Sequence, residues 1–177
     1  MQKLSIKVIL LFIGLFPLKN LAQEEDVSFN CVNKEFNELY FMIGEWVVEG
    51  TYRLNREHVI SKGKSIIQLD LGGCLLKEKF IGFHQNEPYE QINLFSFRND
   101  KFYMVSVETD HGGMGLFIDD NNNGEFSFTI EWNERVMNKH NIFEIGKNAF
   151  KTETHLTIDG GLTWNLVQKA TYNRIMY

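Results

Sequence analysis

The chain has 177 residues, of which 44% are hydrophobic, 23% are charged and 14% are aromatic, with 15 Phe against only two Pro. This composition is typical of one globular domain with a phenylalanine-rich core and excludes a disordered chain. The 18 basic and 23 acidic residues give a net charge of −5. Because an acidic surface repels phosphate backbones, we expect no nucleic-acid partner.

Residues 1–22 have the layout of a secretory signal peptide. Lys3 and Lys7 form a basic start, residues 8–18 are apolar, and Ala22 is a small residue in front of a cleavage point. Cleavage there would remove three lysines and no acid, which changes the net charge from −5 to −8. We therefore expect an exported protein, either periplasmic or secreted, with no membrane span in the mature chain. An uncleaved N-terminal anchor is the alternative.

The mature chain would then consist of a polar segment at 23–31 and one domain at 32–177, with one cysteine in each. Disulfides persist in exported proteins, so Cys31 and Cys74 form a candidate disulfide. Two buried free thiols are the alternative, because cysteine often serves as a small apolar residue.

The first element expected in the domain is a short helix that Gly44 ends. Asn33 is its candidate N-cap. The apolar residues that recur at helical spacing are Val32, Phe36, Leu39, Tyr40 and Ile43.

After Gly44 the apolar residues alternate with a period of two, which is typical of strands. Turn signals rich in Asn, Asp, Gly and Pro separate the expected strands. These strands are 45–53, 64–71, 75–83, 91–97, 102–109, 115–118, 125–132, 141–145, 150–158 and 164–172.

Short strands at regular spacing, with no helix between them, predict an all-β fold and exclude a parallel βαβ architecture. A sandwich and a closed barrel both fit this pattern. Hairpin-length turns favour the single antiparallel β-barrel, which also removes exposed strand edges. We expect about 8–10 strands, with the short N-terminal helix over one end.

Two turn segments resemble known motifs. Residues 157–164 read TIDGGLTW and match the Asp-box hairpin, in which an Asp side chain accepts backbone N–H bonds across the turn. The box recurs in each blade of sialidase-like propellers but occurs once here, so we assign it a structural role. Residues 119–124 match the first half of a calcium loop, but Ile130 stands where a bidentate Glu is required. A plain hairpin turn is therefore expected there.

Other chemistry-bearing residues are scattered. His111 lies in the glycine-rich break 109–115, where a flexible loop is the simplest interpretation. Glu78 shares the predicted inner face with Leu76, so it needs a raised pKa or a cationic partner, for which Arg135 is a candidate. The other histidines lack the spacing of helical metal ligands, and we expect no metal and no cofactor.

Three stretches resemble a bacterial family known only as a domain of unknown function, with a lipocalin-like (calycin-like) barrel. They are Phe41–Trp46 (FMIGEW), Leu71–Glu78 (LGGCLLKE) and a closing DGGLTW followed by Tyr172-Asn173-Arg174. The resemblance spans 36–174 and implies the barrel fold. It assigns no catalytic residue, and 108–115 departs from its pattern.

A barrel of this size can hold one small ligand in its mouth. The leading hypothesis is therefore an exported protein that binds a small, partly apolar molecule. The expected ligand-binding residues are Trp46, Glu78, Phe80, His111, Trp132 and Arg135.

Three alternatives stay open. A small cavity enzyme, such as an isomerase, lyase or cyclase, could use Glu78 or His111 as its general base, with Arg135 stabilising negative charge. A haem-binding barrel would need an inward His on a strand, for which only His155 is suitably placed. The third alternative is a structural or protein-interaction barrel with a filled core.

Overall fold

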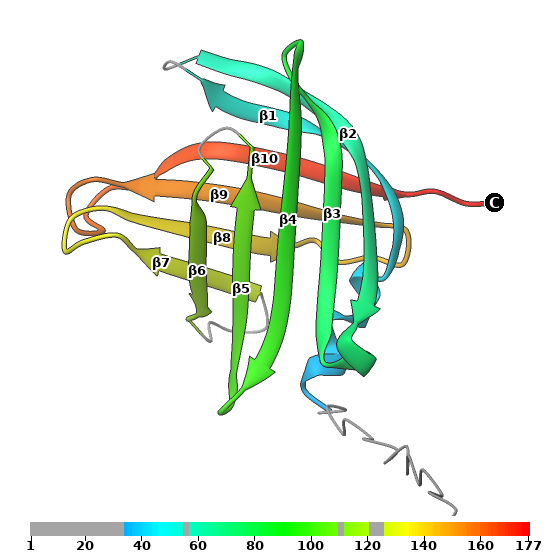
Figure 1. The fold of residues 1–177 in the computed structure, drawn as a ribbon. Coiled ribbons are helices and arrows are strands. Elements are labelled where there is room, and N and C mark those ends of the chain that lie inside the picture. The colour runs from blue at the N-terminus through cyan, green and yellow to red at the C-terminus, as the bar shows by residue number, and fades with distance from the viewer. Residues whose placement is uncertain (1–33, 55–56, 110–111, 121–125) are drawn as a thin grey trace, which may run out of the picture.

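The computed structural model describes residues 34–54, 57–109, 112–120 and 126–177. They form one closed barrel of ten antiparallel strands in sequence order (Figure 1). The strands are β1 (Gly44–Leu54), β2 (Glu57–Asp70), β3 (Leu75–His84), β4 (Glu87–Arg98), β5 (Lys101–Glu108), β6 (Met114–Asp119), β7 (Phe126–Glu131), β8 (Met137–Phe143), β9 (Ala149–Thr157) and β10 (Asn165–Arg174). The prediction of an antiparallel barrel is thus confirmed, and the sandwich is excluded by the β1–β10 pairing.

The barrel is flattened into two crossing layers. The axes of strands β3 to β6 are aligned with one another in the front layer. Strands β7 to β10 and β1 form the layer behind and cross the front layer at a steep angle (Figure 1). The C-terminal ends of β1, β3, β5, β7 and β9 lie at one end, which we call the mouth. The opposite end, which we call the base, carries two 3₁₀ helices, η1 (Phe36–Met42) and η2 (Leu71–Gly73).

Side chains alternate between the interior and the surface along each strand. In β3, Leu76, Glu78 and Phe80 are buried, at 0%, 2% and 5% exposure. This burial confirms the predicted register of β3, including an inward Glu78. The same pattern places Phe126, Phe128 and Ile130 of β7 toward the interior.

The base is closed by aromatic packing around Trp46, whose side chain is fully buried. The indole Nε1 donates to the Met42 carbonyl at 2.7 Å, and the Phe150 ring packs edge-on at 4.8 Å. Arg174 lies over the indole with its guanidinium 4.1 Å from the ring centroid. The same guanidinium donates to the carbonyls of Ile43 at 2.7 Å and Phe41 at 2.8 Å. One arginine thus ties the end of η1 to the last strand.

The predicted N-terminal helix is present as η1, a 3₁₀ helix rather than an α-helix. Its buried residues are Phe36, Leu39 and Met42, which pack on the barrel core. The candidate N-cap Asn33 lies outside the described residues. Gly44 begins β1 at a φ of 148°, and a Cβ there would collide with Arg174 Nη1. Glycine is therefore required at this position by the arginine as much as by the turn.

Strand β2 has 14 residues where eight were predicted, because polar residues occupy some inner positions and apolar residues occupy some outer ones. Ser61 and Ser65 are buried, whereas Ile60 and Ile66 are 58% and 49% exposed. Gly63 lies between the two serines, and a Cβ there would stand 2.6 Å from the ring of Phe80. A prediction that expects apolar residues at every second, inward position does not recognise such a segment as a strand.

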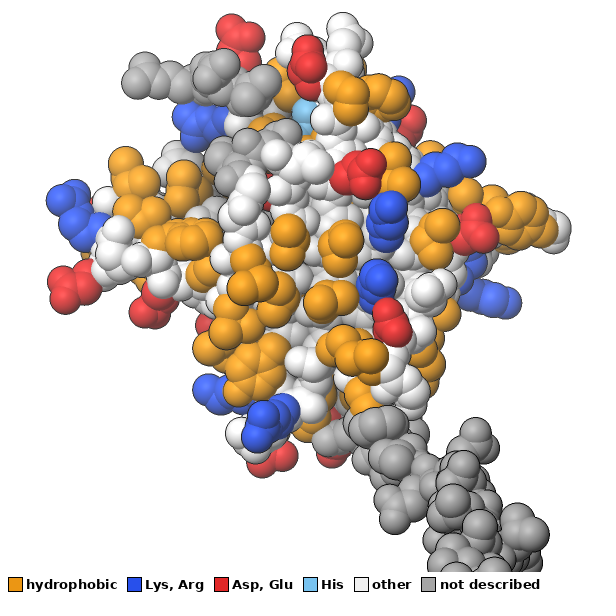
Figure 2. Space-filling model, viewed as in Figure 1, with side chains coloured by type: hydrophobic (Ala, Val, Ile, Leu, Met, Phe, Trp, Pro, Cys, Tyr) orange, Lys and Arg blue, Asp and Glu red, His pale blue; other side chains and the backbone are white. Residues whose placement is uncertain are grey.

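The outer surface of the barrel also carries apolar side chains. Hydrophobic groups are spread over the face formed by β3 to β6, with charged groups between them (Figure 2). The most exposed of these include Ile81, Phe83, Met114 and Leu116. No helix among the described residues has both the length and the apolar character needed to cross a membrane.

The Asp-box hairpin between β9 and β10 has the predicted geometry. Asp159 accepts hydrogen bonds from the Thr157 hydroxyl at 2.7 Å and the Thr163 backbone N–H at 2.9 Å. Bonds from the Thr163 side chain and backbone lower the Asp159 pKa from 3.8 to about 2. The motif stabilises a turn at the mouth of the barrel.

Candidate functional site: a cavity at the mouth of the barrel

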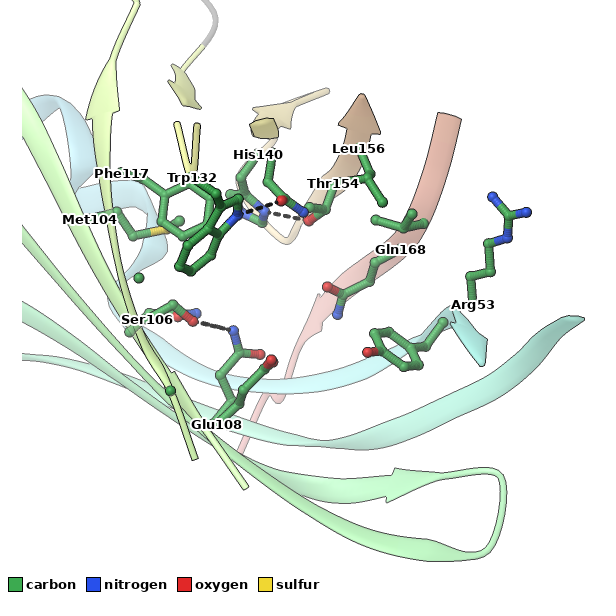
Figure 3. A pocket seen from close by; sticks show the side chains of 17 residues that line it. Arg53, Met104, Ser106, Glu108, Phe117, Trp132, His140, Thr154, Leu156 and Gln168 are labelled. Carbon is green, nitrogen blue, oxygen red and sulfur yellow. Dashed lines mark hydrogen bonds between the residues drawn. The ribbon is translucent and has the colours of Figure 1, made fainter. Parts of the chain in front are cut away.

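The barrel interior is not filled at its mouth. A cavity of about 470 Å³ opens there, between the two layers (Figure 3). Its apolar lining consists of Tyr52, Met104, Phe117, Trp132, Leu156 and Val167. Its polar lining comprises four amides (Gln91, Asn93, Asn138 and Gln168), two hydroxyls (Ser106 and Thr154), Glu108 and His140. A volume of this size suits a small organic molecule.

A glycine widens the cavity on the β6 side. Gly115 faces the interior, and a Cβ on it would stand 3.0 Å from the Phe117 ring and 3.2 Å from Ile130. Among the described residues, strands β6 and β7 are paired only at Ile118–Thr129 and Asp119–Phe128. The wall is therefore splayed on the mouth side of that pairing, where Phe117 and Trp132 line the cavity.

A ladder of hydrogen bonds runs along the β4–β5 wall. Gln91 Nε2 donates to Asn93 Oδ1 at 3.1 Å and to Ser106 Oγ at 2.8 Å (Figure 3). The Tyr89 hydroxyl donates to Glu108 Oε2 at 2.6 Å and lies 3.3 Å from Gln91 Oε1. These contacts fix the amide orientations, because each amide has one donor end and one acceptor end.

The ladder ends below the cavity at Glu78. Asn93 Nδ2 donates to Glu78 Oε2 at 2.8 Å, and the Ser65 hydroxyl donates to Oε1 at 2.7 Å. Tyr172 contacts the same carboxylate, and burial, followed by the charge and hydrogen bond of Glu78, raises the Tyr172 pKa well above its ordinary value. A buried carboxylate is tolerated because its oxygens are satisfied by hydroxyl and amide donors.

His140 occupies the opposite wall, on β8. Its Nδ1 lies 2.9 Å from the Thr154 hydroxyl of β9. Removal from bulk water lowers the His140 pKa from 6.5 to about 4, so the imidazole is neutral at pH 7. The accessible part of this side chain faces the cavity. A neutral imidazole offers a ligand one donor or one acceptor and no charge.

Trp132 stands at the rim of the cavity, directly after β7, and is 55% exposed. Its Nε1 donates to Asn138 Oδ1 at 2.9 Å (Figure 3). This bond fixes the indole, so its apolar face is presented to the cavity at little cost in side-chain entropy. Arg53 is also at the rim, with its guanidinium directed away from the other lining side chains (Figure 3).

The residues predicted to bind a ligand do not lie together. Trp132 lines the cavity, whereas Trp46 closes the base and Phe80 belongs to the buried core. Glu78 lies beneath the cavity, behind Asn93. His111 lies outside the described residues.

Arg135 does not fill the role expected of it as the partner of Glu78. Its side chain is exposed in the β7–β8 connection, and its carbonyl accepts from Gly160 N–H of the Asp-box turn at 3.0 Å. Glu78 is satisfied instead by neutral donors on neighbouring strands.

Other sequence expectations lie partly beyond the described residues. Cys74 is disulfide-bonded, and its predicted partner Cys31 lies outside the description, so the pairing stays a prediction. The predicted signal peptide 1–22 and the Asn-rich turn at 121–125 are also outside it.

Within the described ranges, no group of three or more His, Cys, Asp or Glu is arranged to hold a metal ion. His155 faces Glu153, with Nε2 and Oε2 3.8 Å apart.

Sequence reasoning missed most of the polar lining. Gln91, Asn93 and Ser106 stand at positions of β4 and β5 where the alternation calls for apolar residues. The signal that could have identified them is a polar residue at a position that the alternation assigns to the inner face. A shift of the strand register by one residue would give the same pattern. His140 gave no such signal, because β8 was predicted to begin at 141 and begins at Met137.

Neither the scan against protein-family models nor the search of the curated proteins finds a match to this chain. The closed ten-stranded antiparallel barrel is compatible with a lipocalin-like fold. The comparisons give no support to the resemblance to the family of unknown function. The cavity is therefore the feature of the molecule that bears on its function.

Proposed function

We propose that the protein is exported and binds a small, partly apolar molecule in the cavity at the mouth of the barrel. The observation that carries the proposal is the cavity itself, about 470 Å³ with a mixed lining, in a barrel that is otherwise packed with aromatic and aliphatic side chains. Interiors of folded proteins are normally filled to crystal-like density, so a cavity of this size indicates a binding site.

The lining supports this assignment in two ways. Phe117, Met104 and the fixed face of Trp132 offer apolar surface, which contributes affinity in proportion to the area removed from water. The amides and hydroxyls of the opposite walls offer directional contacts that would orient the ligand. The hydrogen-bond ladder makes these groups rigid before any ligand arrives, which limits the entropy lost on binding.

The enzyme alternative has weaker support. Glu78, one of the two residues predicted as a general base, does not line the cavity, and both of its oxygens accept hydrogen bonds from neighbouring strands. His140 is a neutral imidazole in the cavity, but its Nδ1 faces the Thr154 hydroxyl rather than a carboxylate that would orient it as a base. The binding function therefore remains the conclusion.

Native and denaturing mass spectrometry of the protein purified from the exported fraction would test the proposal directly. A non-covalent mass present only under native conditions would identify the ligand class. The same spectra would report cleavage after Ala22 and the mass deficit of a disulfide.

Titration with N-phenyl-1-naphthylamine, a neutral fluorescent probe, would locate the site. Gln168→Trp fills the cavity, because the Gln168 side chain points into it (Figure 3). Lys169→Trp is the matched control, since the next residue of β10 is exposed. We expect the probe to bind the wild-type protein and the Lys169 variant and to be lost from the Gln168 variant. Equal binding by all three proteins would place the probe on the apolar outer surface and contradict the proposal.

A further inference from the structure

Ser106 on β5 is the point at which the hydrogen-bond ladder of the β4–β5 wall meets the cavity, and the inference drawn from it rests on the proposed function. The ladder begins at the carboxylate of Glu78, which is 2% exposed. The Ser65 hydroxyl donates to Oε1 at 2.7 Å, and the Tyr172 side chain hydrogen-bonds to the same carboxylate. Since a carboxylate only accepts, Asn93 must turn its amide nitrogen toward Oε2, 2.8 Å away.

The direction set at Glu78 passes along the ladder one amide at a time. Asn93 Oδ1 faces Gln91 and can only accept, so Gln91 turns its Nε2 toward that oxygen at 3.1 Å. The second proton of this amide is donated to Ser106 Oγ at 2.8 Å. The other end of the Gln91 amide, Oε1, lies 3.3 Å from the Tyr89 hydroxyl. Each assignment follows from the one before it, so the buried carboxylate determines the polarity of the whole ladder.

Ser106 therefore meets the cavity as a hydrogen-bond donor. Among the side-chain hydrogen bonds of the described residues, the bond from Gln91 is the one that involves Ser106, and in it the hydroxyl oxygen accepts. The hydroxyl proton remains for a ligand, since Ser106 lines the cavity (Figure 3). A hydroxyl whose oxygen already accepts is also a stronger donor, because successive hydrogen bonds polarise one another.

The opposite wall of the cavity offers a second donor. Trp132 Nε1, which can only donate, lies 2.9 Å from Asn138 Oδ1, and this contact assigns the oxygen of the Asn138 amide. The amide nitrogen of Asn138 remains as a donor, and both residues line the cavity. A ligand oxygen that accepts can thus be matched on either wall, close to the apolar surface of Trp132.

We propose that the ligand is an apolar molecule with a carbonyl oxygen, as in a ketone or an ester, and that this oxygen accepts a hydrogen bond from the Ser106 hydroxyl. A carbonyl oxygen only accepts and carries no proton, which complements a side chain held in the role of donor. The apolar body of the ligand lies against Phe117 and Trp132. Glu108 Oε2, nearer the mouth, accepts from the Tyr89 hydroxyl and is not part of this contact.

Three bicyclic probes test the inference: 1-tetralone, which has a carbonyl oxygen, tetralin, which has no polar group, and indole, which has an N–H donor and no oxygen. Each competes with N-phenyl-1-naphthylamine for the wild-type protein and for Ser106→Ala. We expect the substitution to weaken the binding of 1-tetralone about fivefold, as for the loss of one neutral hydrogen bond. The affinities for tetralin and indole should change by no more than about twofold.

The matched control is Ser127→Ala, because the Ser127 side chain is also buried but donates to Asn141 Oδ1 and is not among the described residues that line the cavity. It should leave the affinities for all three probes unchanged. Unfolding curves verify that each variant is folded.

The inference is overturned if 1-tetralone does not displace the fluorescent probe, or if Ser106→Ala leaves its affinity unchanged. An equal loss for all three probes, a loss confined to indole, or the same loss in the Ser127 variant would overturn it as well. The proposed function stands in each of these cases, since the fluorescent probe is still bound. If the fluorescent probe itself fails to bind, the proposed function fails first.

Discussion

The two ends of this barrel are built from the same ten strands but with different chemistry. At the base the inward side chains are aromatic or aliphatic and include Trp46, Phe95, Phe128, Ile142 and Phe150, none more than 1% exposed. At the mouth the inward positions of the same strands are mainly amides, hydroxyls, a carboxylate and an imidazole around a cavity. Each of β4, β8 and β9 changes from apolar to polar within one or two inward positions.

This division separates stability from recognition. Apolar burial contributes about 25 cal/mol per Å², so the packed base contributes most of the folding free energy. The mouth offers less apolar burial and instead lines a cavity with polar groups. Substitutions at the base should therefore lower the free energy of unfolding, whereas substitutions at the mouth should mainly weaken ligand binding. Four predictions test this contrast, from the largest expected effect to the smallest.

The largest effect is expected from Trp46→Ala at the base. Removing a fully buried indole should lower the free energy of unfolding by about 3–5 kcal/mol. Trp132→Ala at the mouth is the matched substitution and should cost less than about 1 kcal/mol, because that indole is 55% exposed. Urea denaturation measures both, and titration with N-phenyl-1-naphthylamine should show weaker binding for the Trp132 variant. Equal destabilisation by the two would refute the division between base and mouth.

Arg174→Lys should have the next largest effect. Lysine keeps the charge but cannot span the carbonyls of Phe41 and Ile43 while covering the Trp46 ring. We expect a loss of about 1–3 kcal/mol in the free energy of unfolding. Arg53→Lys at the exposed rim is the control and should be neutral within about 0.5 kcal/mol. If Arg174→Lys is as well tolerated as the control, the arginine is not the link between η1 and β10 that the geometry indicates.

A third prediction uses pH to weaken the mouth alone. The His140 pKa is lowered to about 4, so the unfolded chain, with an ordinary value of 6.5, binds a proton at higher pH than the folded protein does. The His140 contribution to stability is thus complete above pH 6.5 and is lost as the pH falls toward 4. Unfolding midpoints of the wild-type protein should decline over this window more steeply than those of His140→Gln. Parallel curves for wild type and His140→Gln would contradict the lowered pKa.

The smallest effect is expected at the Asp-box turn. The Asp159 pKa is lowered to about 2 from 3.8, so its hydrogen bonds support folding above pH 3.8 and are lost as the pH falls toward 2. Asp159→Asn should flatten the pH dependence of the unfolding midpoint in this window and leave the binding of N-phenyl-1-naphthylamine unchanged. A change in probe binding would mean that the turn shapes the cavity, against the separation described above.

Several elements could be predicted from the sequence because their signals are local. Strand β3 alternates so regularly that its register, including the inward Glu78, follows from the sequence. The Asp-box turn is encoded by TIDGGLTW, since the side-chain hydrogen bonds of Thr157 and Asp159 join residues within a few positions. The start of β2 was missed because polar residues occupy some of its inner positions, and the partner expected for Glu78 was wrong because register alone does not tell which strand supplies the donor.

The sequence by itself determined the fold class, the number of strands to within the expected range and the inward faces of strands such as β3 and β7, because strand periodicity and turn chemistry are local properties. Only the tertiary structure decided which inward residues meet a packed core and which meet a cavity. That distinction depends on barrel closure, which brings Gln91, Ser106, His140 and Gln168 from four different strands around one cavity. No pattern within a single strand carries this information, since the side chains that face one another across a barrel lie far apart in the chain.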